Sequence, residues 1–153
     1  MKKILPGILV LSLIILVLGI IFVGTKKANN NNVNDFYFSN FVGEYYLSKN
    51  SSGRSQLRVV ETFVAEFPEY NQNKGIVRAI PVIYQNHPQE FELVSVTRNG
   101  KVEPVYKQYR EDGLMVIKLG TDDYVYGKQE YKITYKIQDV TEALGSADRL
   151  NWD

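Results

Sequence analysis

The sequence predicts an all-β protein: an antiparallel β-sandwich domain preceded by a single N-terminal transmembrane or signal-anchor helix. Three observations predict it. Residues 4–25 carry no charge, whereas residues 35–153 hold all 11 Tyr and the single Trp of the chain. Several segments in this second part alternate apolar and polar side chains, which is the period of a half-buried strand. Turn sequences separate these segments at spacings typical of antiparallel sandwiches.

The first expected element is the hydrophobic run that lies between two pairs of lysines. As a helix rising about 1.5 Å per residue, its 22 residues from Ile4 to Thr25 span the roughly 30 Å hydrocarbon core of a bilayer. We therefore expect residues 1–27 to form a signal anchor or transmembrane helix. A cleaved signal peptide is the alternative, although the run exceeds the roughly 7–15 apolar residues usual for one. Either interpretation places residues 28–153 on the extracytoplasmic side of a cell membrane.

The second expected element is a stalk, and the third is the domain itself. Residues 28–34 read Ala-Asn-Asn-Asn-Asn-Val-Asn, a polar run that predicts a flexible connection. Residues 35–153 then carry 14 basic against 17 acidic side chains, a formal charge of −3. A mildly acidic surface of mixed sign offers no electrostatic footprint for nucleic acid. The absence of cysteine excludes a disulfide scaffold and a thiolate metal site.

Within the domain, the clearest strand is Tyr131–Ile137, where apolar side chains face one side and Lys or Thr the other. Leu57–Phe67 alternates almost as well. Further strands are expected at Glu44–Ser48, Val77–Tyr84, Phe91–Thr97, Val102–Tyr109 and Leu114–Leu119. Only Val140–Leu150 has a pattern that would suit a short helix. Short strands at such spacings predict an antiparallel sandwich.

Turn sequences fall between these strands: Asn50-Ser51-Ser52-Gly53, Asn86-His87-Pro88, Asn99-Gly100, Asp112-Gly113 and Tyr126-Gly127. The strongest hairpin signal is Arg98-Asn99-Gly100-Lys101. Asn-Gly accepts the positive φ angles that a tight two-residue turn requires.

One candidate recognition residue is Arg78, within Gly75–Pro81. Its guanidinium could hold a carboxylate or phosphate in a bidentate fork. The structural alternative is favoured by the surrounding sequence, because the flanking isoleucines suit a core-facing strand and Pro81 suits an edge or bulge. Under that alternative, Arg78 pairs with an acid such as Glu61 or Glu66 on a neighbouring strand.

The other candidates are Tyr124 and Tyr126, which could form an exposed platform for stacking on a sugar. No nucleophile elbow, phosphate loop or paired catalytic carboxylates appear in the sequence. His87 stands alone in a turn, and Asp122-Asp123 lacks the ligand spacing that calcium requires. We therefore expect no catalytic residue, no cofactor and no metal, and the protein is not expected to be an enzyme.

Several segments together resemble a known family. Asn40–Lys49, Gly53-Arg54-Ser55 and Val60–Pro68 are similar to the YciQ-like predicted bacterial membrane proteins, which share domain of unknown function 2207. The most specific segment is Asn73-Lys74-Gly75-Ile76-Val77-Arg78-Ala79-Ile80-Pro81, which resembles that family's Asn-x-Gly-Ile-x-Arg-x-Ile-Pro signature. Lys74 departs from it, since His is more usual there. Gly127–Tyr135 and Asn151-Trp152-Asp153 extend the resemblance, which covers residues 36–153.

The resemblance implies a signal or anchor, an extracytoplasmic β-domain and then further transmembrane helices, so we expect the chain to be truncated at its C-terminal end. The family carries no established activity, and no catalytic residue is transferred. The expected function is a non-catalytic extracytoplasmic module of a membrane protein, which contacts envelope proteins or itself. The alternative is a surface domain that binds a cell-wall glycan or peptide. A hydrolase would need a pocket that joins His87 to distant acids.

Overall fold

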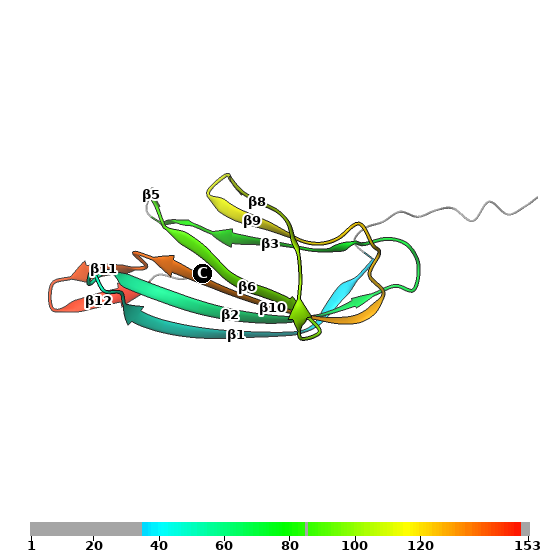
Figure 1. The fold of residues 1–153 in the computed structure, drawn as a ribbon. Coiled ribbons are helices and arrows are strands. Elements are labelled where there is room, and N and C mark those ends of the chain that lie inside the picture. The colour runs from blue at the N-terminus through cyan, green and yellow to red at the C-terminus, as the bar shows by residue number, and fades with distance from the viewer. Residues whose placement is uncertain (1–34, 85, 151–153) are drawn as a thin grey trace, which may run out of the picture. The chain divides into compact units, whose positions relative to one another are not determined.

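The computed structural model describes residues 35–84 and 86–150, which belong to one compact unit (Figure 1). The predicted anchor at 1–27, the stalk at 28–34 and Asn151-Trp152-Asp153 lie outside the described residues. Every strand pairing in the described part is antiparallel, and this part of the chain contains no helix. Over these residues, accordingly, no helical segment has the length and apolarity to cross a bilayer. The all-β prediction is confirmed for this part of the chain.

The strands are, in chain order, β1 (Tyr37–Lys49), β2 (Ser55–Phe67), β3 (Gly75–Pro81), β4 (Ile83–Tyr84), β5 (His87–Pro88), β6 (Phe91–Arg98), β7 (Lys101–Val102), β8 (Val105–Glu111), β9 (Leu114–Gly120), β10 (Gly127–Gln138), β11 (Thr141–Leu144) and β12 (Ala147–Leu150). Two sheets contain most of them. The larger has the order β1-β2-β10-β6-β7, and the smaller has the order β3-β9-β8. The small sheet lies over the large one in a sandwich-like arrangement (Figure 1). The hairpins β4–β5 and β11–β12 complete the described part.

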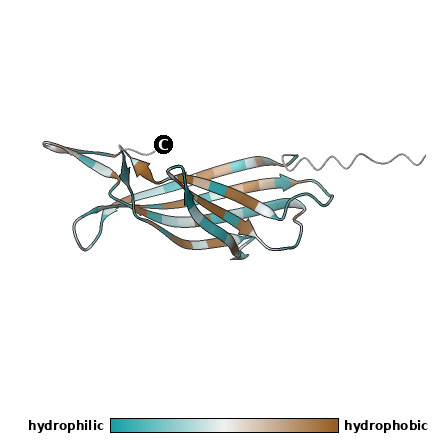
Figure 2. Cartoon of the chain, turned by 90° about the horizontal axis from the view of Figure 1, so that it is seen from above, coloured by the Kyte–Doolittle hydropathy of each residue, from teal (hydrophilic) through white to brown (hydrophobic). Residues whose placement is uncertain are grey.

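The core lies between the two sheets. Alternation on β10 turns Tyr131, Ile133, Tyr135 and Ile137 inward, and all four are fully buried. The facing side of the small sheet contributes Ile76, Ile80, Met115, Ile117 and Leu119. Figure 2 shows these strands as bands of alternating hydropathy. The pattern that predicted the strands is therefore the pattern that builds the core.

The expected hairpin at Arg98-Asn99-Gly100-Lys101 is confirmed. Arg98 pairs with Lys101 across the turn, and both central residues have positive φ, 51° at Asn99 and 76° at Gly100. Asp112 and Gly113 form the same kind of turn between β8 and β9, with φ values of 49° and 79°. These turns set the register of the strands that they join.

Val140–Leu150, the one segment whose pattern would suit a short helix, instead forms the hairpin β11–β12. Gly145, at a φ of 67°, provides the turn. The backbone N–H of Thr141 donates to Ser55 Oγ at 3.1 Å, which fixes the start of β11 against β2. The local sequence pattern of this segment is weak, so strand pairing and the contact with Ser55 decide its structure.

Several expected strands also have different limits. The segment expected as one strand at Val77–Tyr84 is divided at Val82 between β3, which begins at Gly75, and β4. The strand expected at Glu44–Ser48 is the last part of a much longer one, β1. The strand expected at Val102–Tyr109 is interrupted at Glu103-Pro104. Pro104 has no N–H for a ladder, and the buried carboxylate of Glu103 accepts a hydrogen bond from Arg98 Nε at 2.9 Å.

Candidate functional site

The strand β1 forms one edge of the five-stranded sheet and is the first candidate site. Among the residues that the structure describes it pairs with β2 alone, so its other side is a sheet edge. A bulge interrupts this pairing between Phe38 and Asn40, after which Asn40–Lys49 pairs regularly with Ser55–Val64. Of the described residues, those in the buried core come from other segments and none from β1. β1 is thus held in place by regular pairing with β2, but other elements of the described part leave its side chains largely uncovered.

One row of β1 side chains shares the face that β2 turns into the core. Leu47 lies opposite Leu57, Tyr45 opposite Val59, and Phe41 opposite Phe63, and opposite residues of an antiparallel pair share a face. The β2 residues Leu57 and Val59 are buried, yet Leu47, Tyr45 and Phe41 are each about half exposed, at 50%, 47% and 50%. The small sheet therefore covers β2 but not β1.

Both faces of β1 expose large apolar groups. We name the set the β1 surface: Tyr37, Phe38, Phe41, Val42, Tyr45, Tyr46 and Leu47. Only Glu44 and Lys49 are charged among the 13 residues of this strand. Proteins commonly protect sheet edges with charge, proline or bulges. The bulge protects only the beginning of β1 and leaves Asn40–Lys49 as an open apolar edge.

Contacts within the domain hold several of these rings in place. Phe38 and Phe41 both pack on Phe63, with ring centroids 5.5 and 4.9 Å apart. The ring of Tyr46 lies beneath Arg58, and its hydroxyl donates to Glu44 Oε2 at 2.6 Å. This hydrogen bond and the carboxylate charge raise the pKa of Tyr46. A surface whose rings are already ordered loses less side-chain entropy when a partner binds.

The predicted recognition residue Arg78 instead lies inside the sandwich. Its Nε donates to Glu61 Oε2 at 2.8 Å and its Nη2 to Glu61 Oε1 at 2.6 Å. Glu61 is 1% exposed and also accepts a hydrogen bond from the Tyr135 hydroxyl at 3.1 Å. The hydrogen bond with Glu61 raises the pKa of Arg78, although burial opposes it. The expected pairing with Glu61 is confirmed, but it crosses between the sheets instead of joining neighbours in one sheet.

The predicted pair Tyr124 and Tyr126 lies in the loop between β9 and β10, on either side of the buried Val125. The Tyr126 hydroxyl donates to Asn71 Oδ1 at 2.6 Å, and the Lys74 Nζ lies 5.3 Å from the centroid of the Tyr124 ring. Both rings are partly exposed and contact the loop between β2 and β3. They do not line the hollow that lies beside them.

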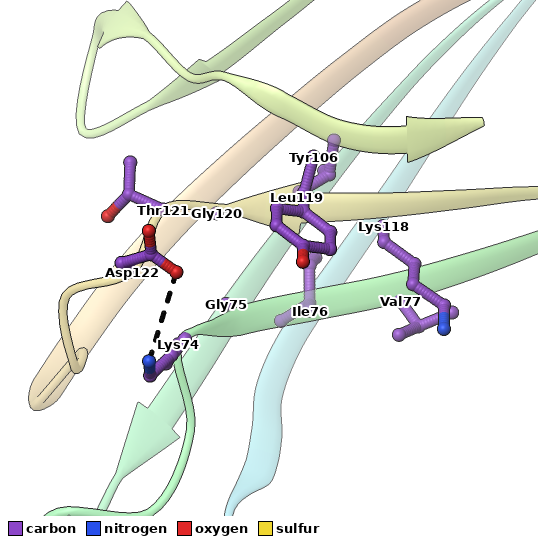
Figure 3. A pocket seen from close by; sticks show the side chains of 10 residues that line it. All are labelled: Lys74, Gly75, Ile76, Val77, Tyr106, Lys118, Leu119, Gly120, Thr121 and Asp122. Atoms are coloured by element: carbon purple, nitrogen blue, oxygen red, sulfur yellow. Dashed lines mark ion pairs between the residues drawn. The ribbon is translucent and has the colours of Figure 1, made fainter.

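This hollow is the second candidate site. It has a volume of about 350 Å³ and lies on the small sheet (Figure 3). It is lined by Lys74, Gly75, Ile76, Val77, Tyr106, Lys118, Leu119, Gly120, Thr121 and Asp122. Gly75 and Gly120 lie opposite each other with φ values of 149° and 134°. A Cβ would lie 1.9 Å from the carbonyl oxygen of Leu119 at Gly75, and 1.9 Å from that of Lys74 at Gly120, so only glycine permits this close approach.

Polar and aromatic side chains surround that glycine pair. Tyr106 is the extra residue of a bulge between Val105 and Lys107 and is 70% exposed. Figure 3 shows it between Lys74 with Asp122 at one end and Lys118 beside Val77 at the other. Sequence reasoning missed Tyr106 and Lys118. The bulge that turns Tyr106 toward the hollow depends on strand pairing, and no local pattern announces it.

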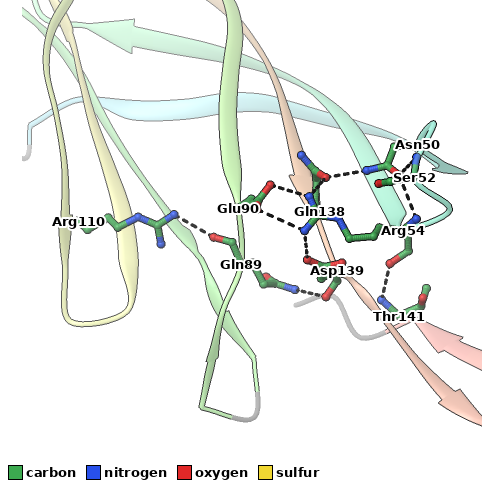
Figure 4. Close-up of polar contacts among 10 residues, drawn as sticks. Asn50, Ser52, Arg54, Gln89, Glu90, Arg110, Gln138, Asp139 and Thr141 are labelled. Carbon is green, nitrogen blue, oxygen red and sulfur yellow. Dashed lines mark hydrogen bonds and ion pairs between the residues drawn. The ribbon is translucent and has the colours of Figure 1, made fainter.

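A third group of polar side chains lies around Arg54 (Figure 4). Arg54 donates to Glu90 Oε2 at 3.0 Å, to Asp139 Oδ2 at 2.9 Å and to Gln138 Oε1 at 2.8 Å. The hydrogen bond with Glu90 raises the pKa of Arg54. Asn50 donates to the same Gln138 oxygen at 2.8 Å. These contacts join the β1–β2 turn to the segments before β6 and after β10, and they satisfy one another, so the group is structural.

His87 is exposed on β5 and lines neither the hollow nor this polar group. Comparisons with protein-family models, with curated proteins and with solved structures find no match. The resemblance to the YciQ-like family stays a prediction.

Proposed function

We propose that this chain is a non-catalytic contact module on the extracytoplasmic side of a membrane. Residues 1–27 anchor it to the bilayer, and the β1 surface joins it to another envelope protein. The observation that carries the proposal is the exposure of seven large apolar side chains along one sheet edge. Such a patch, combined with free backbone groups, marks a site of strand addition. The uncharged run at 4–25 and the family resemblance support the extracytoplasmic placement.

The partner that fits this edge is a second copy of the chain. In a twofold arrangement about Gly43, residues 40–46 of the two copies run antiparallel. Phe41 then lies opposite Tyr45 of the second copy, and Glu44 lies opposite Val42. Glu44 is the only charged residue in this segment, so the arrangement brings no like charges together. The five-stranded sheets of the two copies then form one continuous sheet. The row Phe41, Tyr45 and Leu47 of each copy lies on the same face of that sheet.

The twofold register can be tested through charge. In the full-length chain in detergent micelles, Val42→Glu places a carboxylate opposite Glu44 of the second copy, whereas Val42→Lys places an ammonium there. The position is the same and is exposed in both cases. We expect Val42→Glu to shift the dimer toward monomer and Val42→Lys to retain it, as measured by sedimentation velocity. Opposite charges across a strand pair stabilise it and like charges destabilise it.

Val102→Glu is the matched control, because Val102 is an exposed valine on the short edge strand β7. It should leave the dimer unchanged. A monomeric wild-type chain would overturn self-association through β1. Equal weakening by both substitutions at Val42 would overturn the register about Gly43. The chain has no cysteine, so crosslinking provides an independent check of the same register. A mixture of the Val42→Cys and Glu44→Cys variants should form a disulfide between one copy of each.

A further inference from the structure

The hollow beside Gly75 and Gly120 is open and has a volume of about 350 Å³. Its floor is bare because the close approach of β3 and β9 permits no side chain at either glycine. Tyr106 presents most of its ring to solvent above this floor. A tyrosine offers an apolar ring face together with a polar edge, and it loses little conformational entropy on binding. An open, shallow hollow of this kind suits a sugar ring better than an apolar molecule, which needs deeper enclosure.

Within the described part of the chain, two of the three charged side chains that line the hollow are positive. Lys118 lines it directly, and its Nζ lies 5.7 Å from the Tyr109 ring, which Lys107 approaches to 5.0 Å. Lys74 lines the other end. These lysines gather on a domain whose formal charge is −3. The local excess of positive charge therefore runs against the average and favours an anionic ligand.

The negative group at the hollow is Asp122. Its nearest carboxylate oxygen lies 4.0 Å from the Lys74 Nζ, and its side chain is 98% exposed. A loose, exposed ion pair contributes little stability, so an anionic ligand can replace Asp122 at small cost. The Lys74 ammonium also lies over the Tyr124 ring, which keeps it beside the hollow when that pair opens.

We propose that this hollow binds an anionic glycan. Tyr106 stacks on a sugar ring above the glycine floor, and Lys74 and Lys118 bind anionic groups at the two ends of the hollow. The separation of the lysines, with the ring between them (Figure 3), suits an extended chain of acidic sugars. The proposal uses no residue of the β1 surface, so it and the proposed contact function fail separately.

The test is a binding titration of the full-length chain in detergent micelles with a short oligogalacturonate as the probe. We expect saturable binding, and Tyr106→Ala and Lys118→Gln should each weaken it by about tenfold, the loss that corresponds to one good contact. Tyr106 is exposed, so its truncation leaves the buried core intact. Tyr70→Ala, at another exposed tyrosine, and Lys101→Gln, at a lysine on β7, are the matched controls and should bind like the wild type.

Two further probes separate this proposal from its alternatives. A neutral galactose oligomer should bind at least about tenfold more weakly than the acidic one, because it lacks partners for the lysines. A short poly-glutamate peptide should bind weakly and show no dependence on Tyr106. Equal binding of both acidic probes, without loss in Tyr106→Ala, would show general attraction of polyanions or acidic peptides and overturn the glycan site. Absence of oligogalacturonate binding to the folded wild type would also overturn it.

Discussion

Two tyrosines on β10 provide a matched pair for testing how the core is built. Tyr131 and Tyr135 turn to the same face of the strand, and both are 0% exposed. The Tyr135 hydroxyl donates to Glu61 Oε1 at 3.1 Å. The Tyr131 hydroxyl has no hydrogen-bond partner among the residues that the structure describes. Replacing either tyrosine with phenylalanine removes one hydroxyl from an equally buried site. The hydroxyl removed is hydrogen-bonded at Tyr135 and unpaired at Tyr131.

The two substitutions should change the free energy of unfolding in opposite directions. An unpaired buried hydroxyl costs about 1–3 kcal/mol, so Tyr131→Phe should stabilise the domain by about 1 kcal/mol. A hydrogen bond to a charged group contributes about 1.5–3 kcal/mol, so Tyr135→Phe should destabilise it by about 2 kcal/mol. The predicted difference between the two variants is therefore about 3 kcal/mol, well above the error of a urea titration.

The same hydroxyls predict a dependence on alkaline pH. Burial raises the pKa of Tyr131 to about 12, and burial, followed by the charge of Glu61, raises that of Tyr135 as well. Unfolded tyrosine loses its proton near about pH 10. These groups thus leave stability independent of pH below about pH 10 and lower it as pH rises toward about 12, by about 1.4 kcal/mol per pH unit for each tyrosine. Tyr131→Phe should make this decline shallower.

The measurement is urea unfolding of residues 28–153 followed by far-ultraviolet circular dichroism, at neutral pH and in steps above pH 9. If the dependence of the unfolding free energy on urea concentration is the same in all variants, a change in the urea midpoint reports a change in stability. If Tyr131→Phe destabilises the domain as much as Tyr135→Phe does, the unpaired state of the Tyr131 hydroxyl is refuted. An unchanged alkaline decline in Tyr131→Phe would refute the assignment of that decline to this residue.

Two further predictions concern the buried ion pair and the glycine floor. Arg78→Met should lower the free energy of unfolding by about 3–5 kcal/mol, because Glu61 is left buried without its cation. Arg54→Met should lower it far less, because the carboxylate partners of Arg54 are exposed. Similar urea midpoints for these variants would contradict the difference in burial. Gly75→Ala should prevent folding or lower the melting temperature sharply, because its Cβ meets the Leu119 carbonyl. Gly53→Ala has open space around it and should cost only the roughly 1–2 kcal/mol of its left-handed backbone. Equal melting temperatures would contradict the close approach.

Much of the fold could be predicted from local patterns. The alternation at Tyr131–Ile137 identified both the strand and its buried face, because a strand's two faces differ at every step. Asn99-Gly100 identified its hairpin, because few other pairs accept positive φ at both positions. An acidic partner for Arg78, either Glu61 or Glu66, was also predicted, since a charged residue on a buried strand needs an opposite charge; the structure shows that it is Glu61. The hairpin within Val140–Leu150 was not predicted, because the local pattern is weak and the structure of this segment depends on Gly145 and on a contact with Ser55.

The candidate sites were less predictable. Tyr124 and Tyr126 were proposed as a stacking platform because they are tyrosines in an expected loop. The structure places both against the loop between β2 and β3. Tyr106 was missed because its exposure depends on a bulge in the pairing of β8 with β9. The apolar residues of β1 looked like core residues in the sequence. They lie on both faces of the strand, a pattern that also occurs in a strand buried on both sides, and the sequence does not show whether another sheet covers them.

The sequence by itself determined the class of fold, the positions of the main strands and turns, and the face that each strand turns inward. These properties follow from interactions between residues close together in the chain. Only the tertiary structure decided which inward faces are covered. The small sheet β3-β9-β8 extends over β2 and β10 and leaves β1 open, an outcome set by pairings between distant segments. The exposed edge and the glycine-floored hollow arise from those pairings, and both proposed sites lie where the two sheets leave side chains in water.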